Sequence, residues 1–179
     1  VYGGNSLLEN QNHPDYTNKK VAIIGGGNVA MDCARTIKRM GAEQVVVIYR
    51  RSEAEMPAES KEISDAKKEG VEFLFLNNIV KILGTNKVEK IECIKTELVQ
   101  KEGETRKSPV NIENSNYILN MDYVVMAVGG EVDKDLIEKC NISTTTKKYV
   151  QVNENNQTSD EKVFAGGDVV GHNSTVAWA

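Results

Sequence analysis

The chain has 179 residues, of which 40% are hydrophobic and 27% are charged, values typical of a globular protein with a sizeable core. Its 22 Lys and Arg residues are outnumbered by 26 Asp and Glu residues, and the net charge of −4 argues against a general nucleic-acid-binding protein. No apolar run approaches the ~20 residues of a membrane span, and no signal peptide is recognisable. We therefore expect a soluble, cytoplasmic protein that binds neither nucleic acid nor membranes.

The cysteines and the two chain ends limit the interpretation further. Cys33, Cys93 and Cys140 are far apart and form no CxxC pair, so neither a disulfide scaffold nor a metal site is indicated. We expect three free thiols packed as small apolar side chains. The chain begins with Val1 rather than Met and stops at Ala179, and we interpret it as a segment of a longer polypeptide.

A strand, a glycine-rich turn and a helix are predicted at the start of the informative region. Residues 21–24 form a β-branched apolar run typical of a buried parallel strand. Residues 25–30 have the pattern Gly-x-Gly-x-x-Ala, and a helical pattern over 31–40 ends before a glycine. An apolar strand over 45–49 completes a βαβ unit, the context in which the dinucleotide-binding fingerprint occurs.

Each fingerprint position has a physical role in this interpretation. Gly25 permits a tight turn, and Gly27 lacks the Cβ that would hold a pyrophosphate away from the backbone. Ala30 lets the helix pack closely on the strand. The helix start offers N–H groups and a positive dipole end to phosphates, and Asn28 is placed to cap the helix or to contact a phosphate. The alternative is a structural glycine turn without a ligand.

Two arginines follow the second strand. Arg50 and Arg51 lie where an NAD-specific protein places Asp or Glu for the ribose 2′-hydroxyl. Two guanidinium groups suit a 2′-phosphate, which they bind through charge-assisted, bidentate hydrogen bonds. The sequence therefore favours NADP over NAD, and the alternative is a pair of surface arginines without a ligand. Glu53 and Glu55 lie just beyond the strand, and we expect them to be solvated.

The middle of the chain predicts a helix and an antiparallel meander. Helical spacing covers residues 58–69, and a third strand is predicted over 71–76. Alternating apolar residues between turn residues then predict an antiparallel meander. Its segments are 79–83, 88–99 and 117–119. The polar stretch 101–116 is expected to be a loop.

The last third of the chain predicts one more buried strand and a glycine-containing turn. The strand over 123–128 ends at Gly129, near the edge where α/β sheets bind ligands. Short strands are expected over 150–152 and 163–165. Asp168 follows the second of them and a glycine pair, a pattern that by itself is typical of a turn.

Three stretches together resemble a known family. They are residues 25–35 (GGGNVAMDCAR), 49–58 (YRRSEAEMPA) and 163–170 (VFAGGDVV). These stretches resemble the small subunit of NADPH-dependent glutamate synthase. Relatives of that subunit include the flavoprotein of electron-bifurcating NADPH:ferredoxin oxidoreductases, part of dihydropyrimidine dehydrogenase and, more distantly, adrenodoxin reductase. The resemblance covers most of the chain.

The resemblance implies a flavoprotein in which an NADPH domain is inserted into an FAD domain. The fold is then α/β, with a Rossmann-like parallel sheet and an antiparallel β-meander crossover, flanked by pieces of the FAD domain. On this match, residues 1–19 are a flanking segment of the FAD domain, 20–145 the NADPH-binding domain and 146–179 a truncated FAD-domain piece.

The match also implies which residues bind the two cofactors. The NADPH pyrophosphate is assigned to Gly25, Gly27, Asn28, Val29 and Ala30. The 2′-phosphate is assigned to Arg50 and Arg51, and the nicotinamide side to Gly129. The FAD ribityl–phosphate region is assigned to Asp168 with Gly167 before it, and the flavin ring to the backbone of Thr175 and Val176.

The activity implied is hydride transfer from NADPH to FAD, followed by electron transfer to iron–sulfur clusters or a partner subunit. The clusters would lie in the parent protein or its partner, and the segment supplies no metal ligand and no catalytic side chain. Its partners would be the missing FAD-domain half and an electron-accepting subunit or ferredoxin-like protein. Alone, we expect it to be inactive. The alternatives are a non-catalytic NADP(H)-sensing Rossmann module and a self-contained dehydrogenase, which lacks room for a substrate domain.

Overall fold

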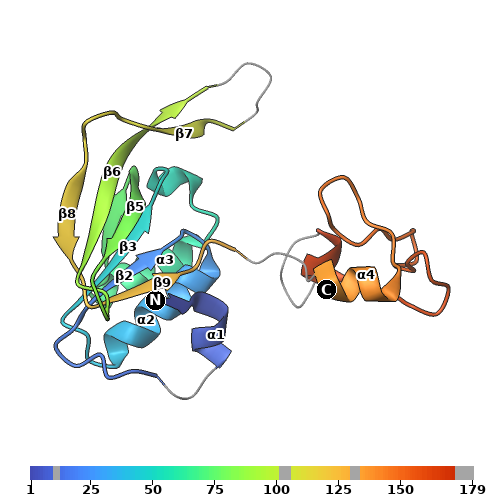
Figure 1. Ribbon diagram of the computed structural model, residues 1–179, viewed down its shortest axis with the longest axis horizontal. Coiled ribbons are helices and arrows are strands. Elements are labelled where there is room, and N and C mark those ends of the chain that lie inside the picture. The colour runs from blue at the N-terminus through green and yellow to red at the C-terminus, as the bar shows by residue number, and fades with distance from the viewer. Residues whose placement is uncertain (10–12, 101–105, 130–133, 172–179) are drawn as a thin grey trace. The chain divides into compact units, whose positions relative to one another are not determined.

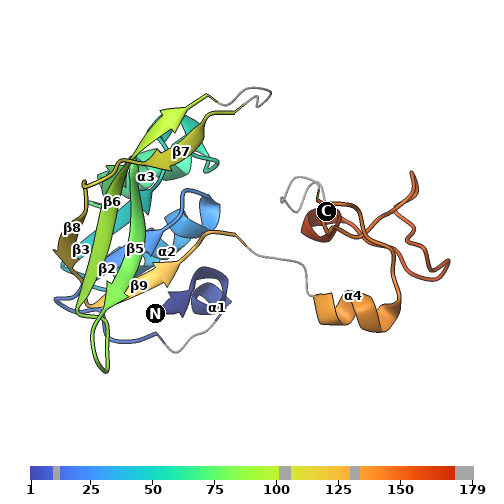
Figure 2. The same ribbon diagram turned by 45° about the horizontal axis from the view of Figure 1, so that its top comes forward.

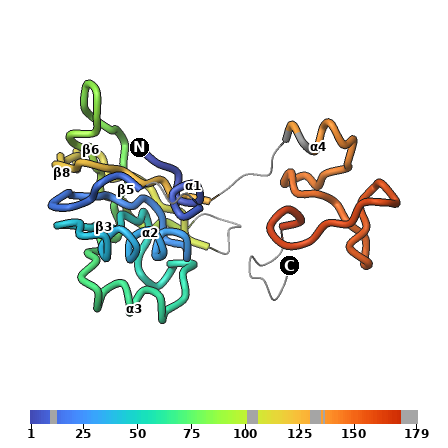
Figure 3. The backbone as a smooth tube through the Cα atoms, turned by 90° about the horizontal axis from the view of Figure 1, so that it is seen from below, coloured from blue at the N-terminus to red at the C-terminus, as the bar shows by residue number. Residues whose placement is uncertain are grey.

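The computed structural model describes residues 1–9, 13–100, 106–129 and 134–171. The chain divides into two compact units, Val1–Gly129 and Gly130–Ala179. The first unit is built in three layers, in which a parallel sheet lies between a layer of helices and an antiparallel sheet (Figures 1 and 3).

The central layer is a five-stranded sheet in the order β1-β9-β2-β3-β4, and every neighbouring pair is parallel. Its strands are β1 (Tyr2–Gly3), β2 (Lys20–Ile24), β3 (Gln44–Tyr49), β4 (Glu72–Phe75) and β9 (Tyr123–Met126). Both faces of β2 and β3 are covered, so their sequences are almost continuous apolar runs. The four strands predicted for this sheet are confirmed, whereas β1 was not predicted.

The helical layer covers one face of this sheet. It consists of α1 (Gly4–Glu9), α2 (Asn28–Arg39) and α3 (Ser60–Lys68). Alternate residues of β2 and β3 point into this layer, where they meet the buried stripe of α2. The stripe consists of Ala30, Met31, Cys33, Ala34 and Ile37. These side chains recur at helical spacing, which is why the periodicity predicted α2 correctly.

The third layer is an antiparallel sheet on the opposite face. Its strands are β5 (Asn77–Leu83), β6 (Lys90–Val99), β7 (Ser108–Asn111) and β8 (Tyr117–Asn120). β6 is paired with β5 on one side, and with β8 and then β7 along the other. Figure 2 shows β5 and β6 running across the parallel strands. Because these strands lie in the chain between β4 and β9, the predicted meander crossover is confirmed.

The prediction of a loop over 101–116 is wrong for residues 108–111, which form β7. This strand is half-buried or exposed and contains Pro109, so its own sequence carries no apolar alternation. It forms because Thr96–Val99 of β6 offer an unpaired edge, and the register runs from Thr96↔Asn111 to Val99↔Ser108.

The second unit contains little regular structure within its described residues, 134–171. Its elements are α4 (Lys134–Cys140) and the short 3-10 helix η2 (Gly167–Val170). The strands predicted over 150–152 and 163–165 are wrong, because these segments form only the isolated bridges Thr144↔Val150 and Gln157↔Phe164. Two or three apolar residues give too short a ladder for a strand unless neighbours extend it.

No helix in the described ranges is both long and apolar enough to cross a membrane.

Candidate functional site

The glycine turn, residues 25–30, begins where β2 ends against the end of β9. Gly25 has a φ of +140°, and a Cβ at this position would lie 2.1 Å from the carbonyl oxygen of Ala127. The Ala127 N–H also donates to the Ile24 carbonyl at 2.8 Å, which holds the two strand ends together. Gly25 is therefore required by the turn itself.

The next two glycines differ in what surrounds them. A Cβ at Gly26 would lie 2.6 Å from the ring of Tyr49, so the fold requires glycine there. At Gly27 the nearest atom would be Pro57 Cγ at 4.0 Å, and the backbone has an ordinary φ of −92°. The fold would accept a larger residue at position 27. The absence of a side chain there leaves open space beside the backbone.

Helix α2 starts at this open space. The N–H groups of Ala30 and Met31 donate to the Gly27 carbonyl at 3.0 and 3.2 Å. The N–H groups of Asn28 and Val29 come before the first intrahelical bond, so the helix gives them no partner, and the positive end of the helix dipole lies here. Ala30 is fully buried and allows the close approach of α2 to the sheet.

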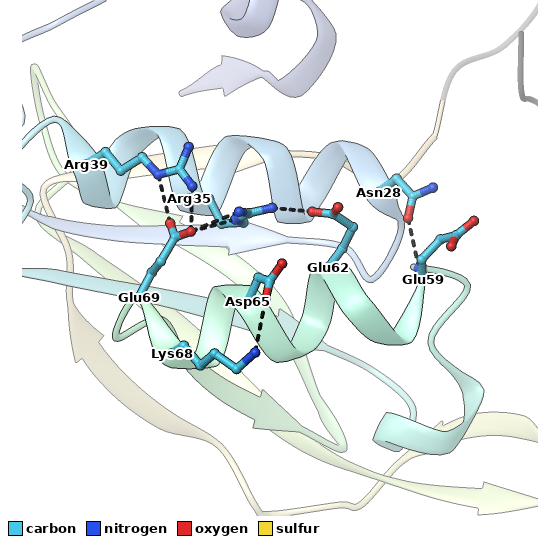
Figure 4. A network of polar contacts seen from close by, with 8 residues as sticks. All are labelled: Asn28, Arg35, Arg39, Glu59, Glu62, Asp65, Lys68 and Glu69. Carbon is cyan, nitrogen blue, oxygen red and sulfur yellow. Dashed lines mark hydrogen bonds and ion pairs between the residues drawn. The ribbon is translucent and has the colours of Figure 1, made fainter.

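The Asn28 side chain does not cap α2. Its Oδ1 accepts a hydrogen bond from the Glu59 N–H at 3.0 Å, just before α3 begins, and no side-chain cap bond is made to α2 (Figure 4). The cap prediction is wrong because Asn28 is the first residue of α2, and the cap position is occupied by Gly27. The Asn28 amide nitrogen points away from Glu59, so contact with a phosphate remains a prediction.

Ion pairs hold α3 against α2 behind the turn (Figure 4). Arg35 Nη2 lies 2.9 Å from Glu69 Oε1, and Arg35 also pairs with Glu62. Arg39 Nη2 lies 2.5 Å from the same Glu69 oxygen. Hydrogen bonds from Arg39 and then from Arg35 hold the pKa of Glu69 below its usual value. This cluster keeps the start of α3 beside Asn28.

The arginine turn, residues 50–55, follows β3 and is held by the antiparallel layer. The buried Thr96 hydroxyl of β6 donates to the Arg50 carbonyl at 2.8 Å. The Leu76 N–H donates to the Arg51 carbonyl at 3.0 Å, and the Thr96 N–H donates to the Leu76 carbonyl at 2.8 Å. Sequence reasoning missed Thr96, because half of the ten residues of β6 are polar and no local signal distinguishes this one.

The second half of the arginine turn is a 3-10 helix, η1 (Glu53–Glu55), with a capping box. Ser52 donates to Glu55 Oε2 through both its N–H at 3.1 Å and its hydroxyl at 2.5 Å. The Ser52 hydroxyl is the main reason that the pKa of Glu55 lies below its usual value. The expectation of a solvated side chain is therefore wrong for Glu55, while the exposed Glu53 pairs with Lys67 at 2.5 Å.

Two contacts join the arginine turn to the glycine turn. The Tyr49 ring fills the space that Gly26 leaves, and its hydroxyl donates to the Glu55 carbonyl at 2.9 Å. Farther along, the Ala58 N–H donates to the Gly26 carbonyl at 3.0 Å. The chain thus leaves the glycine turn through α2 and β3 and returns to it after the arginines.

The geometry of the joined turns fits an anionic ligand. Arg50 is exposed, and Arg51 is half-buried. Among the polar side-chain atoms described, Arg51 Nη1 is a buried donor without a hydrogen-bond partner. A buried donor that lacks an acceptor is costly unless a ligand or water supplies one. The joined turns therefore offer two positions that can bind an anionic group. One lies beside Gly27 at the start of α2, and the other lies at Arg51.

The other predicted site residues lie in different surroundings. Gly129, with a φ of +108°, is exposed beyond the carboxyl end of β9, the sheet edge that also carries both turns. In the second unit, Gly167 is buried with a φ of +69°, and Asp168 is exposed within η2. The predictions for Thr175 and Val176 lie outside the described residues.

The cysteines offer no metal or redox centre in the described ranges. No cluster of three or more His, Cys, Asp or Glu side chains suitable for a metal is found there. Burial raises the pKa of Cys33 and of Cys93 to about 11, so both thiols stay protonated at neutral pH. Cys140 is exposed, and the prediction that it is packed is wrong.

The sequence matches known proteins over most of its length. Residues 3–179 match the family described as pyridine nucleotide-disulphide oxidoreductase. The chain is 38% identical to the NADP(+)-dependent formate dehydrogenase subunit beta of Moorella thermoacetica, over 88% of this chain and 22% of that protein. It is 36% identical to the glutamate synthase [NADPH] small chain of Halomonas elongata, over 92% of this chain and 38% of that protein. The chain thus spans well under half the length of these relatives.

Solved structures show the same fold. The crystal structure of T. acidophilum thioredoxin reductase gives a TM-score of 0.72 and 21% identity over 91% of this chain and 48% of that one. Mycobacterium tuberculosis FprA in complex with NADPH gives a TM-score of 0.63 and 18% identity over 82% of this chain and 46% of that one. With the family match over nearly the whole sequence, this chain belongs to the pyridine nucleotide-disulphide oxidoreductase family.

Proposed function

We propose that residues 20–145 are the NADPH-binding domain of a flavoprotein oxidoreductase similar to the glutamate synthase small chain. In this proposal residues 1–19 and 146–179 flank it as pieces of an FAD domain that the rest of the polypeptide completes. Residues 2–9 of the first piece also pack on the first unit, where β1 pairs with β9 and Leu7 of α1 joins the core. The observation that carries the proposal is the pairing of two features at one sheet edge. They are the open backbone at Gly27 and the unpartnered, buried donor of Arg51.

Different residues of the first unit bind different parts of NADPH in this proposal. Gly25 and Gly27 bring the backbone close to the pyrophosphate, while Ala30 keeps α2 near the sheet. The N–H groups of Asn28 and Val29, at the positive end of α2, donate to it. Arg50 and Arg51 bind the 2′-phosphate through charge-assisted hydrogen bonds. Gly129, beyond β9, lines the nicotinamide side.

The second unit supplies part of an FAD site in this proposal. Asp168 accepts hydrogen bonds from the ribityl–phosphate region, and the turn at Gly167, with its positive φ, positions that carboxylate. The assignment of Thr175 and Val176 to the flavin ring stays part of the proposal. The exposure of Asp168 supports this assignment, because an exposed carboxylate at a glycine-containing turn is accessible to a ligand.

The bound nicotinamide and flavin supply hydride transfer as their own chemistry. The chain's part is to bind, orient and shield the two cofactors, and none of its side chains is required as a general acid or base. The electrons are proposed to continue to iron–sulfur clusters outside this segment or to a partner subunit. The names of the relatives, a small chain and a subunit beta, support a partner.

A cytoplasmic location is part of the proposal. Cys140 is an exposed free thiol, which a reducing compartment preserves.

The test is anaerobic reduction of the full-length protein loaded with FAD. NADPH is expected to bleach the flavin absorbance, and NADH to do so much more slowly at equal concentration. Replacing both Arg50 and Arg51 by Ala should remove that difference. Tight NADPH binding without any bleaching would contradict the proposal and favour an NADP(H)-sensing module instead.

A further inference from the structure

We propose that Arg106, on the β6–β7 hairpin, is a third arginine of the 2′-phosphate site and helps to set the preference for NADPH over NADH. The inference rests on the proposed function and adds to that site a specificity residue from the antiparallel layer. Arg106 lies 55 positions after Arg51 in the sequence, and no sequence motif links these two arginines.

Arg106 reaches the arginine turn directly. Its Nη2 donates to the Glu55 carbonyl oxygen at 2.6 Å, across 51 positions of sequence. Residues Ser108–Asn111 that follow it form β7, which is paired with β6, so the hairpin brings Arg106 to the turn. Figures 1 and 2 show β6 and β7 extending together beyond the end of the parallel sheet.

The surroundings of Glu55 place several cations together. Arg51 and Lys107 both lie close enough to the Glu55 carboxylate to help lower its pKa. Arg106 contacts the carbonyl of the same residue. The other carboxylate of the turn, Glu53, is already paired with Lys67. Among the described residues of the arginine turn and the hairpin end, Arg50, Arg51, Arg106 and Lys107 outnumber Glu53 and Glu55, which favours the binding of a dianion.

Arg106 is not needed to satisfy the turn. The Glu55 carbonyl already accepts the Tyr49 hydroxyl at 2.9 Å, so it keeps a partner when Arg106 is removed. A guanidinium group carries five N–H donors, and the bond to Glu55 uses one of them. Arg106 is exposed, so its remaining donors can reach an incoming phosphate. These facts distinguish a ligand-binding role from a purely structural one.

A 2′-phosphate is the group that such a site would recognise. The NADPH and NADH molecules differ only by this phosphate, a dianion bound best by several planar guanidinium groups. Arg106 would approach it from the antiparallel layer, whereas Arg50 and Arg51 approach it from the parallel sheet. The preference would then depend on both sheets.

The experiment measures NADPH and NADH binding by calorimetry to the full-length protein and to Arg106→Ala. The matched control is Lys90→Ala, which removes the same charge from an exposed residue at the opposite end of β6. Arg106→Ala should weaken NADPH binding by about tenfold, the effect of one charge-assisted hydrogen bond, and leave NADH binding unchanged. Lys90→Ala should change neither affinity. Arg106→Lys should bind NADPH with an intermediate affinity, because lysine keeps the positive charge but lacks the planar guanidinium group.

The outcomes separate this inference from the proposed function. If the wild-type protein prefers NADPH and Arg106→Ala keeps that preference, the inference is wrong and the proposed function stands. A parallel loss of NADPH and NADH affinity in Arg106→Ala would assign the residue a structural role and would also overturn the inference. A wild-type protein that binds NADPH no better than NADH contradicts both.

Discussion

The glycine turn and the arginine turn lie at the same edge of one sheet, but they are built differently. The glycine turn is formed by three glycines between a strand and a helix that adjoin it in sequence, and more distant residues such as Ala58 and Ala127 also contact it. The arginine turn has both of its arginine carbonyls held by Thr96 and Leu76, which belong to the antiparallel layer or border it. The glycine turn thus has a local sequence pattern that reveals it, whereas the hydrogen bonds that hold the two arginine carbonyls come from residues that no local pattern marks.

Because the two turns differ in this way, we expect them to control two different properties, the affinity for dinucleotides and the preference between NADPH and NADH. Affinity for a dinucleotide should depend on the glycine turn and affect NADPH and NADH equally, because both carry a pyrophosphate. Preference between them should depend on the arginine turn and therefore on the antiparallel sheet behind it. Substitutions in the two regions are expected to give different patterns.

The largest effect is expected at Gly25, where the turn itself would fail. Gly25→Ala places a Cβ 2.1 Å from the Ala127 carbonyl oxygen and forces Ala to a φ of +140°. We expect a loss of about 3–5 kcal/mol in the free energy of unfolding, measured by denaturant titration. Gly41→Ala is the control, since its φ is also positive at +91° but its nearest contact is 3.8 Å. Equal losses for the two would show that the contact with Ala127 is unimportant.

Gly27→Ala should affect binding and spare the fold. The new Cβ would be 4.0 Å from its nearest protein atom, so the free energy of unfolding should change by less than about 1 kcal/mol. Binding of NADPH and of NADH should weaken together, by about tenfold or more, because the methyl group occupies the approach to the backbone. Calorimetry on the variant measures both affinities. Unchanged binding of both nucleotides would place the pyrophosphate elsewhere.

Thr96→Val should change the preference for NADPH over NADH more than the affinity for dinucleotides in general. Valine keeps the shape but leaves the Arg50 carbonyl without its 2.8 Å hydrogen bond. We expect an unfolding penalty of about 1–2 kcal/mol and a fall of a few-fold in the ratio of NADPH to NADH affinity. Thr85→Val, at an exposed position between β5 and β6, is the control. A loss of stability with an unaltered ratio would mean that Thr96 supports the core without positioning Arg50.

Glu69→Gln should give the smallest effect, and one that depends on pH. The arginines hold the folded-state pKa of Glu69 below its ordinary value. The stability that Glu69 contributes is therefore present above the unfolded-state pKa and is lost as the pH falls through the lowered folded-state pKa. The stability difference between wild type and Glu69→Gln should therefore be present at pH 7 and vanish in acid. Glu97→Gln, an exposed residue of β6, serves as the control. A difference that persists unchanged in acid would exclude the ion pairs as its cause.

The contrast between the two turns also explains what the sequence could predict. The βαβ unit and the meander carry strong local patterns, so their order and the positions of Gly25 and Gly27 were predictable. Thr96 and Arg106 could not be assigned, because each acts on residues about fifty positions away. The formation of strand β7, and of bridges in place of strands over 150–152 and 163–165, depends on pairing with other segments rather than on the composition of each segment. The partner of the Asn28 side chain, the Glu59 N–H, was not predictable either, because it lies 31 positions away, just before α3.

The most direct test of the account compares NADPH and NADH titrations of the full-length protein with those of the variant in which both Arg50 and Arg51 are Ala. The account predicts tighter binding of NADPH by the wild-type protein, and in the variant a loss of that preference with NADH affinity retained. Since salt screens exposed charges, the wild-type preference should also shrink as ionic strength rises. Equal binding of both nucleotides by the wild-type protein would contradict the assignment of the arginine turn to the 2′-phosphate.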